Sequence, residues 1–320
     1  MRVLFLGNHT VGVRTLQTIG ETEEVVGVVA HPADPEDGVR YESVSDLARQ
    51  NGWSLIRCPG RDPRLVSFVR DSRPDLLWIT DYRYLLPSTV ISLASRGVVN
   101  LHPSLLPKYR GRASLNWAIL NGETSLGLTA HFVDAGMDSG DIIAQMSFEL
   151  REDQDVGDAL TILYPLYSEA TRTVLCYFRS GRVPRKPQDH SQATSFPRRR
   201  PEDGLIDWTA PARTVRNLVR GVALPYPGAF TTFGGRKLLV WKAALPPVPL
   251  EQVAQPGTVI AVDGDTLTVQ CADGPLLVTS FECADEDQRA HLRPGVVLGD
   301  WAASVLLVAD PSSKCSGHGR

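Results

Sequence analysis

The chain has 320 residues, of which 42% are hydrophobic and 22% charged, with 33 Lys and Arg against 36 Asp and Glu for a net charge of -3. This composition is ordinary for a globular protein, and the length suits about two domains. The slight acidic excess argues against a broad nucleic-acid surface, which normally carries a basic excess. Without a signal-peptide pattern or an apolar run of roughly 18 residues, we expect a cytoplasmic protein with no membrane partner.

The sequence lacks the motifs of several common kinds of binding and catalytic site. The loop GNHTVG after the first expected strand lacks both the GxGxxG spacing of dinucleotide sites and the GK[ST] of P-loops. No Ser or Cys lies in a GxSxG turn, so a nucleophilic triad has little support. Five cysteines are scattered without CxxC spacing, which favours free thiols over disulfides or a metal site.

Alternating strand and helix patterns organise the first part of the chain. Short β-branched runs predict strands at 2–7, 25–31, 76–80 and 97–102. Apolar positions at helical spacing predict helices at 10–20, 43–52, 63–72 and 87–97. This alternation predicts a mainly parallel sheet with helices on its faces, a Rossmann-like α/β domain.

Helix and strand patterns continue to residue 181, and after a linker the chain becomes mainly β. We expect a helix at 112–122, strands at 128–134 and 141–150, and a long helix at 156–181 in which Pro165 marks a kink or a second start. The proline-rich, charged segment that follows is typical of a linker. Beyond it, one helix at 211–222 and several short strands with GG, DGD and DG turns predict a small barrel of the OB type. The predicted organisation is a domain at 1–190, a linker at 191–204, a barrel at 205–308 and a disordered tail at 309–320.

The run VVNLHPSLLPKYRG, which begins at Val98, carries the first chemical signal. Positions i and i+2 of a strand face the same side, so Asn100 and His102 should project together. Pro103 should end the strand, because it has no N–H and restricts the residue before it. The carboxyl ends of strands are where open α/β sheets place their sites. An ordinary strand exit with polar side chains in water is the alternative.

The loop HFVDAGMDSGD carries Asp134, Asp138 and Asp141 with two glycines. Its spacing does not fit an EF-hand, and a solvated acidic turn is the alternative. If Asp138 meets His102 in space, its carboxylate would orient the imidazole and raise the imidazole pKa.

Other basic and imidazole side chains give weaker signals. His9 lies at a strand end and His131 within a strand, where structural roles and pocket walls are both open. We expect the remaining histidines at the surface: His31, His190, His291 and His318. The run Arg198, Arg199 and Arg200 is typical of a solvated linker, with an acidic partner as the alternative.

At NLHPSLLPKYRG, NWAILNGE, LTAHFVDAGMDSGDII and YPGAF the sequence resembles the folate-dependent formyltransferases. That family includes enzymes that formylate methionyl-tRNA, glycinamide ribonucleotide, amino sugars or hydroxyornithine. The likeness extends from the first strand to the barrel. It implies 10-formyltetrahydrofolate as the formyl donor, no metal, and Asn100, His102 and Asp138 as catalytic residues.

The chemistry of formyl transfer shows why these three residue types would be needed. Attack of an amine on the formyl carbon makes a tetrahedral intermediate with a negative oxygen, to which the Asn100 amide can donate. His102 can carry protons between the amine and the leaving folate nitrogen, with Asp138 tuning it.

The resemblance also implies two binding regions. The pterin of the donor would lie against two segments, Tyr84, Leu85 and Leu86 and the loop residues Asp134, Ala135, Gly136 and Met137. Apolar walls with backbone hydrogen bonds suit such a flat ring. Arg112 would lie near the acceptor, where its guanidinium can meet a phosphate or a carboxylate.

The acceptor amine is left open. The tRNA enzymes of the family carry a long basic loop after the second strand. Here the corresponding segment, residues 31–52, is short and acidic at its start. Few cations are therefore available to neutralise nucleic-acid phosphates. We therefore expect a small amine, either an amino sugar attached to a nucleotide or hydroxyornithine of siderophore assembly. A methionyl-tRNA formyltransferase, a 10-formyltetrahydrofolate hydrolase and a non-catalytic binding module are the alternatives. The sequence gives no indication of an oligomeric state.

Overall fold

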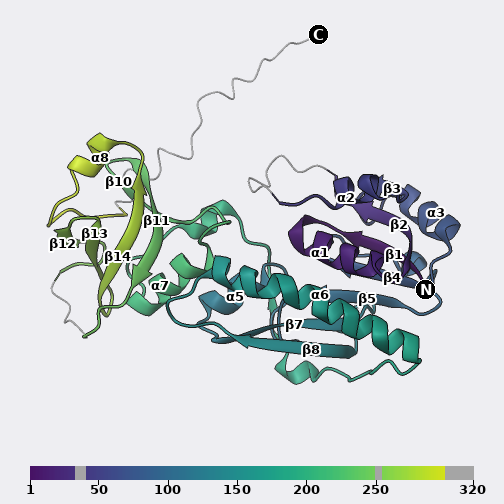
Figure 1. Ribbon diagram of the computed structural model, residues 1–320. Helices are drawn as coiled ribbons and strands as arrows, with labels where there is room; N and C mark the ends of the chain where they lie inside the picture. The colour runs from purple at the N-terminus through teal and green to yellow at the C-terminus, as the bar shows by residue number, and fades with distance from the viewer. Residues whose placement is uncertain (33–40, 249–253, 300–320) are drawn as a thin grey trace, which may run out of the picture. The chain divides into compact units, whose positions relative to one another are not determined.

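The computed structural model describes residues 1–32, 41–248 and 254–299 (Figure 1). The chain divides into two compact units. The first comprises Met1–Ala118 and Glu123–Arg199, and the second comprises Ile119–Gly122 and the chain from Arg200 onward. The tail predicted at 309–320 lies outside the described residues.

A seven-stranded sheet with the order β3-β2-β1-β4-β5-β7-β8 forms the centre of the first unit. Its strands are β1 (Arg2–Gly7), β2 (Glu24–Ala30), β3 (Leu55–Arg57), β4 (Leu76–Thr80), β5 (Val98–His102), β7 (Ser125–Phe132) and β8 (Ile142–Glu149). The strands from β3 to β5 pair in parallel, and β7 and β8 pair antiparallel. This confirms the predicted Rossmann-like sheet. The strand order reverses between β1 and β4, where open α/β sheets bind their ligands.

Helices cover both faces of this sheet (Figure 1). The helices before residue 181 are α1 (His9–Gly20), α2 (Val44–Gln50), α3 (Pro63–Ser72), α4 (Ser88–Ile91), α5 (Ser114–Leu120) and α6 (Val156–Ser180). Leu4 and Leu6 of β1 share a core with Leu65 of α3, whereas Phe5 projects from the opposite face toward Gly12 of α1, as strand alternation requires. The long helix α6 runs through Pro165 as one helix.

The chain after α6 stays in the first unit and pairs with earlier segments of that unit at two places. Lys186 forms a bridge with Ile142 at the start of β8, and β9 (Ser195–Phe196) pairs in parallel with β6 (Arg110–Gly111). We call residues 186–196 the return segment. The predicted linker at 191–204 is therefore not a free connection, because its residues up to Arg199 belong to the first unit and their backbone groups pair with the loop after β5. Two short 3-10 helices, His190–Gln192 and Pro201–Gly204, complete this stretch.

The second unit is an antiparallel sheet with the order β10-β11-β14-β13-β12. Its elements are α7 (Ala212–Gly221), β10 (Ala229–Phe233), β11 (Arg236–Ala244), β12 (Val259–Asp263), β13 (Thr266–Cys271), β14 (Gly274–Cys283) and α8 (Glu286–Ala290). Val219 of α7 packs with Leu238 and Leu267 of the sheet in one apolar core. Five antiparallel strands are the number in a partly open OB-like barrel, so the predicted fold class is confirmed. No helix of the described residues has the length and apolar character needed to cross a membrane.

Candidate active site

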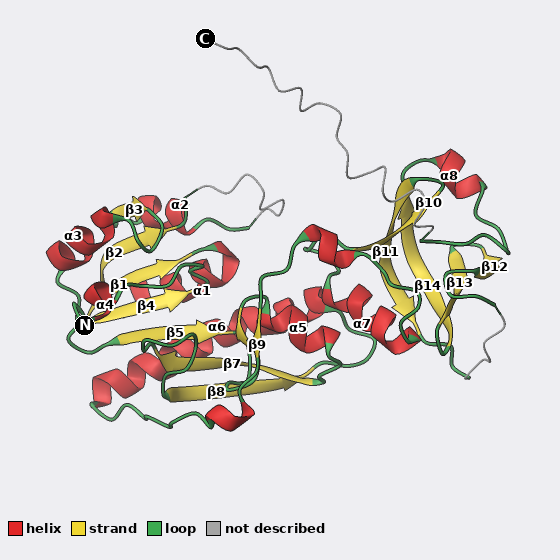
Figure 2. Cartoon of the chain, turned by 180° about the vertical axis from the view of Figure 1, so that it is seen from behind, coloured by secondary structure: helices red, strands yellow, loops and turns green. Residues whose placement is uncertain are grey.

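The carboxyl end of β5 places an amide and an imidazole on one side of the sheet. β5 lies beside β4 (Figure 2), and its last residues include Asn100 and His102. The His102 residue is only 5% exposed. The strand ends there, because Pro103 cannot continue the ladder.

The loop between β7 and β8 folds back over β5 and brings Asp138 to this pair. Asp138 Oδ2 lies 3.7 Å from His102 Nδ1, and Asp138 Oδ1 accepts a hydrogen bond from Asn100 Nδ2 at 3.3 Å. The backbone N–H of Gly111 also donates to Asp138 Oδ2, at 2.9 Å. The three residues that the sequence singled out therefore meet at one point, although they come from two segments, β5 and the β7–β8 loop.

The Tyr109 carbonyl group determines which nitrogen of His102 faces the site. The carbonyl oxygen lies 2.8 Å from His102 Nε2, and a carbonyl can only accept, so Nε2 carries a hydrogen. In the neutral imidazole the lone pair is then on Nδ1, the nitrogen that faces Asp138. Tyr109 is held at a φ of 59°, a left-handed conformation that is costly for a side chain of this size and that clusters at functional sites.

Burial and neighbouring charge have opposite effects on the pKa values of His102 and Asp138. Burial lowers the pKa of His102 below its usual range, and the attraction of Asp138 offsets this only in part. The sequence-based expectation that Asp138 raises the imidazole pKa is thus correct for the carboxylate's own effect, but desolvation outweighs it. Burial alone would raise the pKa of Asp138. The attraction that His102 exerts when it is protonated and the hydrogen bond from the Gly111 N–H nevertheless hold that pKa well below its usual range. The site is therefore a neutral imidazole beside an ionised carboxylate.

His131 of β7 is a fourth member of this cluster. Its Nδ1 donates to the Phe132 carbonyl oxygen at 2.7 Å, so its Nε2 can accept from Asn100 Nδ2 at 3.1 Å. This bond fixes the amide orientation of Asn100, because only the NH2 end can face both His131 and Asp138. From the sequence, His131 could have either a structural role or a place in a pocket wall. The strand register explains its position, since His131 lies directly opposite Asn100.

The segments expected to bind the donor lie at the surface of the first unit. Leu85 is 71% exposed and Met137 is 46% exposed, which is unusual for large apolar side chains. Tyr84 and Leu86 pack partly against the core around α3. The Asp134 carboxylate accepts from Gly136 N–H and Ser139 Oγ at 3.0 and 2.7 Å, which shapes the loop that contains Ala135. Exposed apolar groups on ordered backbone suit a flat ring ligand.

Arg112 lies one residue beyond the Gly111 that binds Asp138, and its side chain is exposed. Its N–H donates to the Phe196 carbonyl oxygen of the return segment at 3.1 Å. Partial desolvation and the neighbouring cations Arg198 and Arg83 lower the pKa of Arg112, which leaves a guanidinium charged at neutral pH. Arg198 and Arg83 therefore lie close enough to repel Arg112, and Asp81 offsets this repulsion only in part. An anionic ligand would stabilise such an arrangement.

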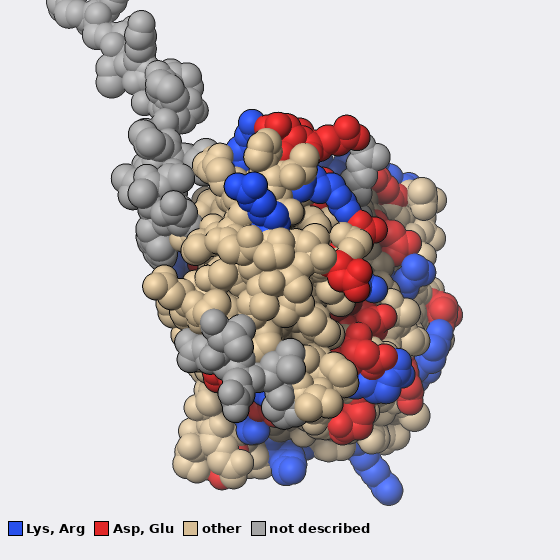
Figure 3. Space-filling view, turned by 90° about the vertical axis from the view of Figure 1, so that its left-hand side faces the viewer, with Lys and Arg blue, Asp and Glu red and all other residues tan. Residues whose placement is uncertain are grey.

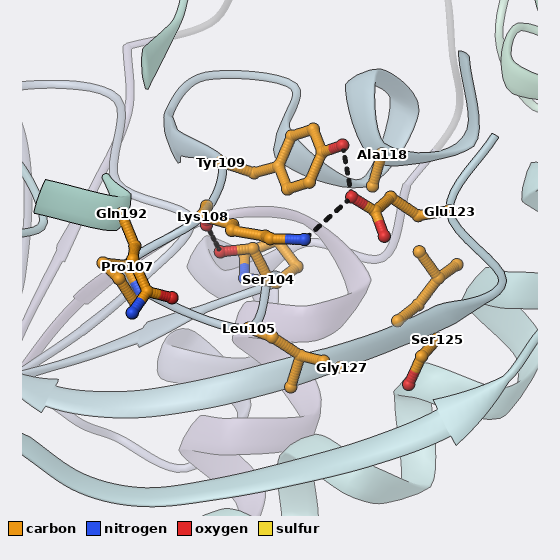
Figure 4. A pocket seen from close by; sticks show the side chains of 12 residues that line it. Ser104, Leu105, Pro107, Lys108, Tyr109, Ala118, Glu123, Ser125, Gly127 and Gln192 are labelled. Atoms are coloured by element: carbon orange, nitrogen blue, oxygen red, sulfur yellow. Dashed lines mark hydrogen bonds and ion pairs between the residues drawn. The ribbon is translucent and has the colours of Figure 1, made fainter. Parts of the chain in front are cut away.

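A cavity of about 280 Å³ lies beside the loop that follows His102 (Figure 4). Glu123 accepts from Tyr109 Oη at 2.9 Å and from Lys108 Nζ at 3.3 Å. The cavity lining includes none of the three residues predicted to be catalytic. Its wall is nevertheless formed by Tyr109, the residue whose carbonyl group orients His102.

Two other histidines lie near the reversal of strand order. His9 Nδ1 is 2.5 Å from Asp81 Oδ2, and both residues have a φ of 56°. His31 is 5% exposed and its Nε2 accepts the Arg83 N–H at 2.9 Å. The prediction of a surface position for His31 was therefore wrong, because its ring packs against Tyr82 and Tyr84.

The described residues contain no group of three or more His, Cys, Asp and Glu side chains arranged to hold a metal ion. The described cysteines are free thiols: Cys58, Cys176, Cys271 and Cys283. Cys315 lies outside the described residues.

Comparison with known families agrees with this geometry. The formyl transferase family model matches residues 1–162, and the model of the formyl transferase C-terminal domain matches residues 199–289. The chain belongs to the formyl transferase family. This is the family that the sequence resembles at the motifs around Asn100 and Asp138.

Solved structures of formyltransferases and of HypX share the fold. WlaRD, a sugar 3N-formyl transferase, has a TM-score of 0.65 at 16% identity over 89% of this chain and 98% of its own. A HypX variant from Aquifex aeolicus has a TM-score of 0.58 at 21% identity over 89% of this chain, which spans only 46% of HypX. Methionyl-tRNA formyltransferase from Clostridium thermocellum has a TM-score of 0.52 at 17% identity over 86% of this chain and all (100%) of its own. At these identities the likeness concerns the fold.

Proposed function

We propose that this formyltransferase moves a formyl group from 10-formyltetrahydrofolate to a primary amine or hydroxylamine of a small molecule. The observation that carries the proposal is the convergence of Asn100, His102 and Asp138 at the end of β5. Transfer breaks the bond between the formyl carbon and the folate nitrogen, forms a bond to the acceptor nitrogen, and moves one proton from the acceptor to the folate nitrogen. Each residue suits one part of this exchange.

Asn100 stabilises the formyl oxygen as it becomes negative. One N–H of its amide is engaged by His131 Nε2, and the other makes the longer bond to Asp138 Oδ1. Catalytic hydrogen bonds are often long before substrate binds. We therefore expect the N–H that makes the longer bond to leave Asp138 and to donate to the reacting formyl oxygen. A single preorganised donor of this type contributes about 3 kcal/mol to catalysis in other enzymes.

His102 moves the proton. Its neutral Nδ1 accepts the proton that the attacking nitrogen must lose, and it can return this proton to the leaving nitrogen. The low pKa that burial imposes on His102 keeps the imidazole in the accepting form at neutral pH. Asp138 then stabilises the imidazolium that forms, without itself taking the proton.

The described residues are suited to holding the donor. Leu85 and Met137 present exposed apolar surface, and a β-carbon at Gly111 would lie 3.5 Å from Met137 Cε, which places that methyl group beside the residue that binds Asp138. When bound, 10-formyltetrahydrofolate supplies the activated formyl group. Tyr84 to Leu86 and Asp134 to Met137 would hold its ring.

For the acceptor, an amino sugar attached to a nucleotide or hydroxyornithine fits the cations of this unit. Arg112, Arg198 and Arg83 can neutralise a phosphate or a carboxylate of the acceptor. The sugar 3N-formyl transferase WlaRD was solved in the presence of dTDP and 5-N-formyl-THF, which supports the nucleotide-linked sugar. On the one face drawn in Figure 3, acidic and basic side chains lie together at the top and right of a largely uncharged surface, and no basic patch of the kind that binds tRNA is seen there among the described residues. Part of the acidic segment after β2, residues 33–40, lies outside the described residues.

Incubation with 10-formyltetrahydrofolate and a panel of amines tests the proposal. The panel contains aminosugar nucleotides, hydroxyornithine, small amino acids and charged initiator tRNA, and mass spectrometry follows the gain of one formyl group. We expect a small amine to be formylated. Formylation of tRNA alone would overturn the choice of acceptor, and release of formate without any amine would identify a hydrolase.

A further inference from the structure

The position of Asp138 raises a structural question. The β7–β8 loop leaves β7 after Phe132, which pairs with Val99, whereas His102 pairs with Thr129 three residues earlier. A hairpin loop that simply continued the strands would project away from His102. Asp138 reaches the imidazole only because the loop is folded back along β5, and the fold-back needs its own hydrogen-bond partners.

Gln188 of the return segment supplies those partners. Its Nε2 donates to the carbonyl oxygens of Asp138 and Gly140, each at 2.8 Å. Two donors meet two acceptors, so the amide nitrogen is fully used. Gln188 is 6% exposed, and buried bonds of this kind are costly to break because the carbonyl groups would be left without partners.

The other end of the same amide is held by Arg110. Gln188 Oε1 accepts from Arg110 Nη2 and Nε at 2.6 and 3.2 Å, and Arg110 is 8% exposed. Arg110 lies between two residues that touch the catalytic groups: Tyr109 accepts from His102, and Gly111 donates to Asp138. One buried amide thus joins the segment that orients the imidazole to the loop that carries the carboxylate.

We infer that Gln188 is a positioning residue of formyl transfer, which with Arg110 holds the Asp138 loop against His102. The loss of turnover expected from this inference rests on the proposed function, whereas the expected change in the pKa of His102 does not. The titratable groups that act on His102 are Asp138 and His131. If the loop loosens and Asp138 moves away, the imidazole loses its attraction to a carboxylate, and the pKa of His102 falls further.

The test compares two variants of Gln188 with a matched control. Gln188→Ala removes both halves of the amide. Gln188→Glu keeps a partner for Arg110 but presents a carboxylate oxygen to the two carbonyl groups. Gln288 is the control, because it is equally buried at 4% exposed, donates to the Phe233 and Arg236 carbonyl oxygens, and accepts from Ala284 N–H, all within the second unit.

Two readouts are measured: kcat for formyl transfer, and the titration midpoint of the His102 imidazole by NMR of isotopically labelled histidine, assigned with His102→Ala. We expect Gln188→Ala to lower kcat about 100-fold, as displacement of a catalytic group by about 1 Å does, and to move the His102 midpoint to lower pH. Gln188→Glu should fold and also lose kcat. Gln288→Ala should lose thermal stability with an unchanged His102 midpoint.

A wild-type kcat in Gln188→Glu would overturn the inference, since it would show that Arg110 needs a partner and the two carbonyl groups do not. An unmoved His102 midpoint in folded Gln188→Ala would overturn it as well. The midpoint needs no turnover. If the wild-type protein transfers no formyl group, the proposed function fails while the NMR comparison still decides the role of Gln188.

Discussion

Replacing Asp138 by Asn removes one charge beside His102 and changes little else in shape. The carboxylate lies 3.7 Å from His102 Nδ1. At that separation the attraction to an imidazolium is about 1 kcal/mol at the dielectric constant of water and about 4 kcal/mol at an effective value of about 20. If His102 becomes fully protonated during transfer, turnover should fall by a factor of roughly 5 to 10³.

The same substitution has a defined effect on pH dependence. His102 must be neutral to accept a proton, so the acid limb of kcat/KM reports its pKa in the free enzyme. An opposite charge raises an imidazole pKa, and its removal therefore moves the acid limb to lower pH. A pH series of kcat/KM for wild type and Asp138→Asn measures this shift. An acid limb that stays in place, or that moves to higher pH, would refute the electrostatic role of Asp138 and leave it a structural one.

Further substitutions test other parts of the site. Asn100→Ala should lower kcat about 100- to 1000-fold with an unchanged circular dichroism spectrum, because an oxyanion donor is lost; wild-type turnover would remove Asn100 from the mechanism. Gly111→Ala should reduce turnover about tenfold or more, since Gly111 has a φ of 95° and a β-carbon there would lie 2.4 Å from the Phe196 carbonyl oxygen; an active, equally stable variant would contradict this packing. Arg112→Ala should raise KM for the acceptor about 10-fold or more with kcat retained, as loss of a charge-assisted bond does, and an unchanged KM would place the acceptor elsewhere. Asp138→Asn should also lower the melting temperature at neutral pH, and its difference from wild type should shrink as the pH falls below the unfolded carboxyl pKa of about 3.9. The depressed pKa of the carboxyl gives stability that is present above its unfolded value and lost as pH falls through the folded one.

Much of the fold follows from local sequence patterns. The runs that predict strands at 2–7, 76–80 and 97–102 match β1, β4 and β5 within a residue, because buried parallel strands are short, continuous apolar segments. The very short elements β3, β6 and β9 carry no such pattern. The linker prediction for residues 191–204 followed from proline and charge content, and the pairing of β9 with β6 depends on contacts that composition does not encode.

The candidate site, like the fold, could be predicted from the sequence only in part. The strand spacing brought Asn100 and His102 together, and the family resemblance added Asp138. The groups that hold these side chains were not predictable in this way, since the Tyr109 carbonyl and the Gly111 N–H are backbone groups common to every residue. Gln188 lies 50 residues from Asp138 along the chain, at the end of the predicted first domain and just before the predicted linker at 191–204. No local signal marks it, because its burial depends on contacts with segments that are distant in the sequence.

The most direct test of formyl transfer follows a labelled formyl group from 10-formyltetrahydrofolate in the presence of the preferred amine. We expect the label to appear in the amine, one formyl group per molecule, and His102→Ala to abolish this transfer while the variant remains folded. Label recovered only as free formate, or equal transfer by wild type and His102→Ala, would contradict the assignment of formyl transfer to the cluster at the end of β5.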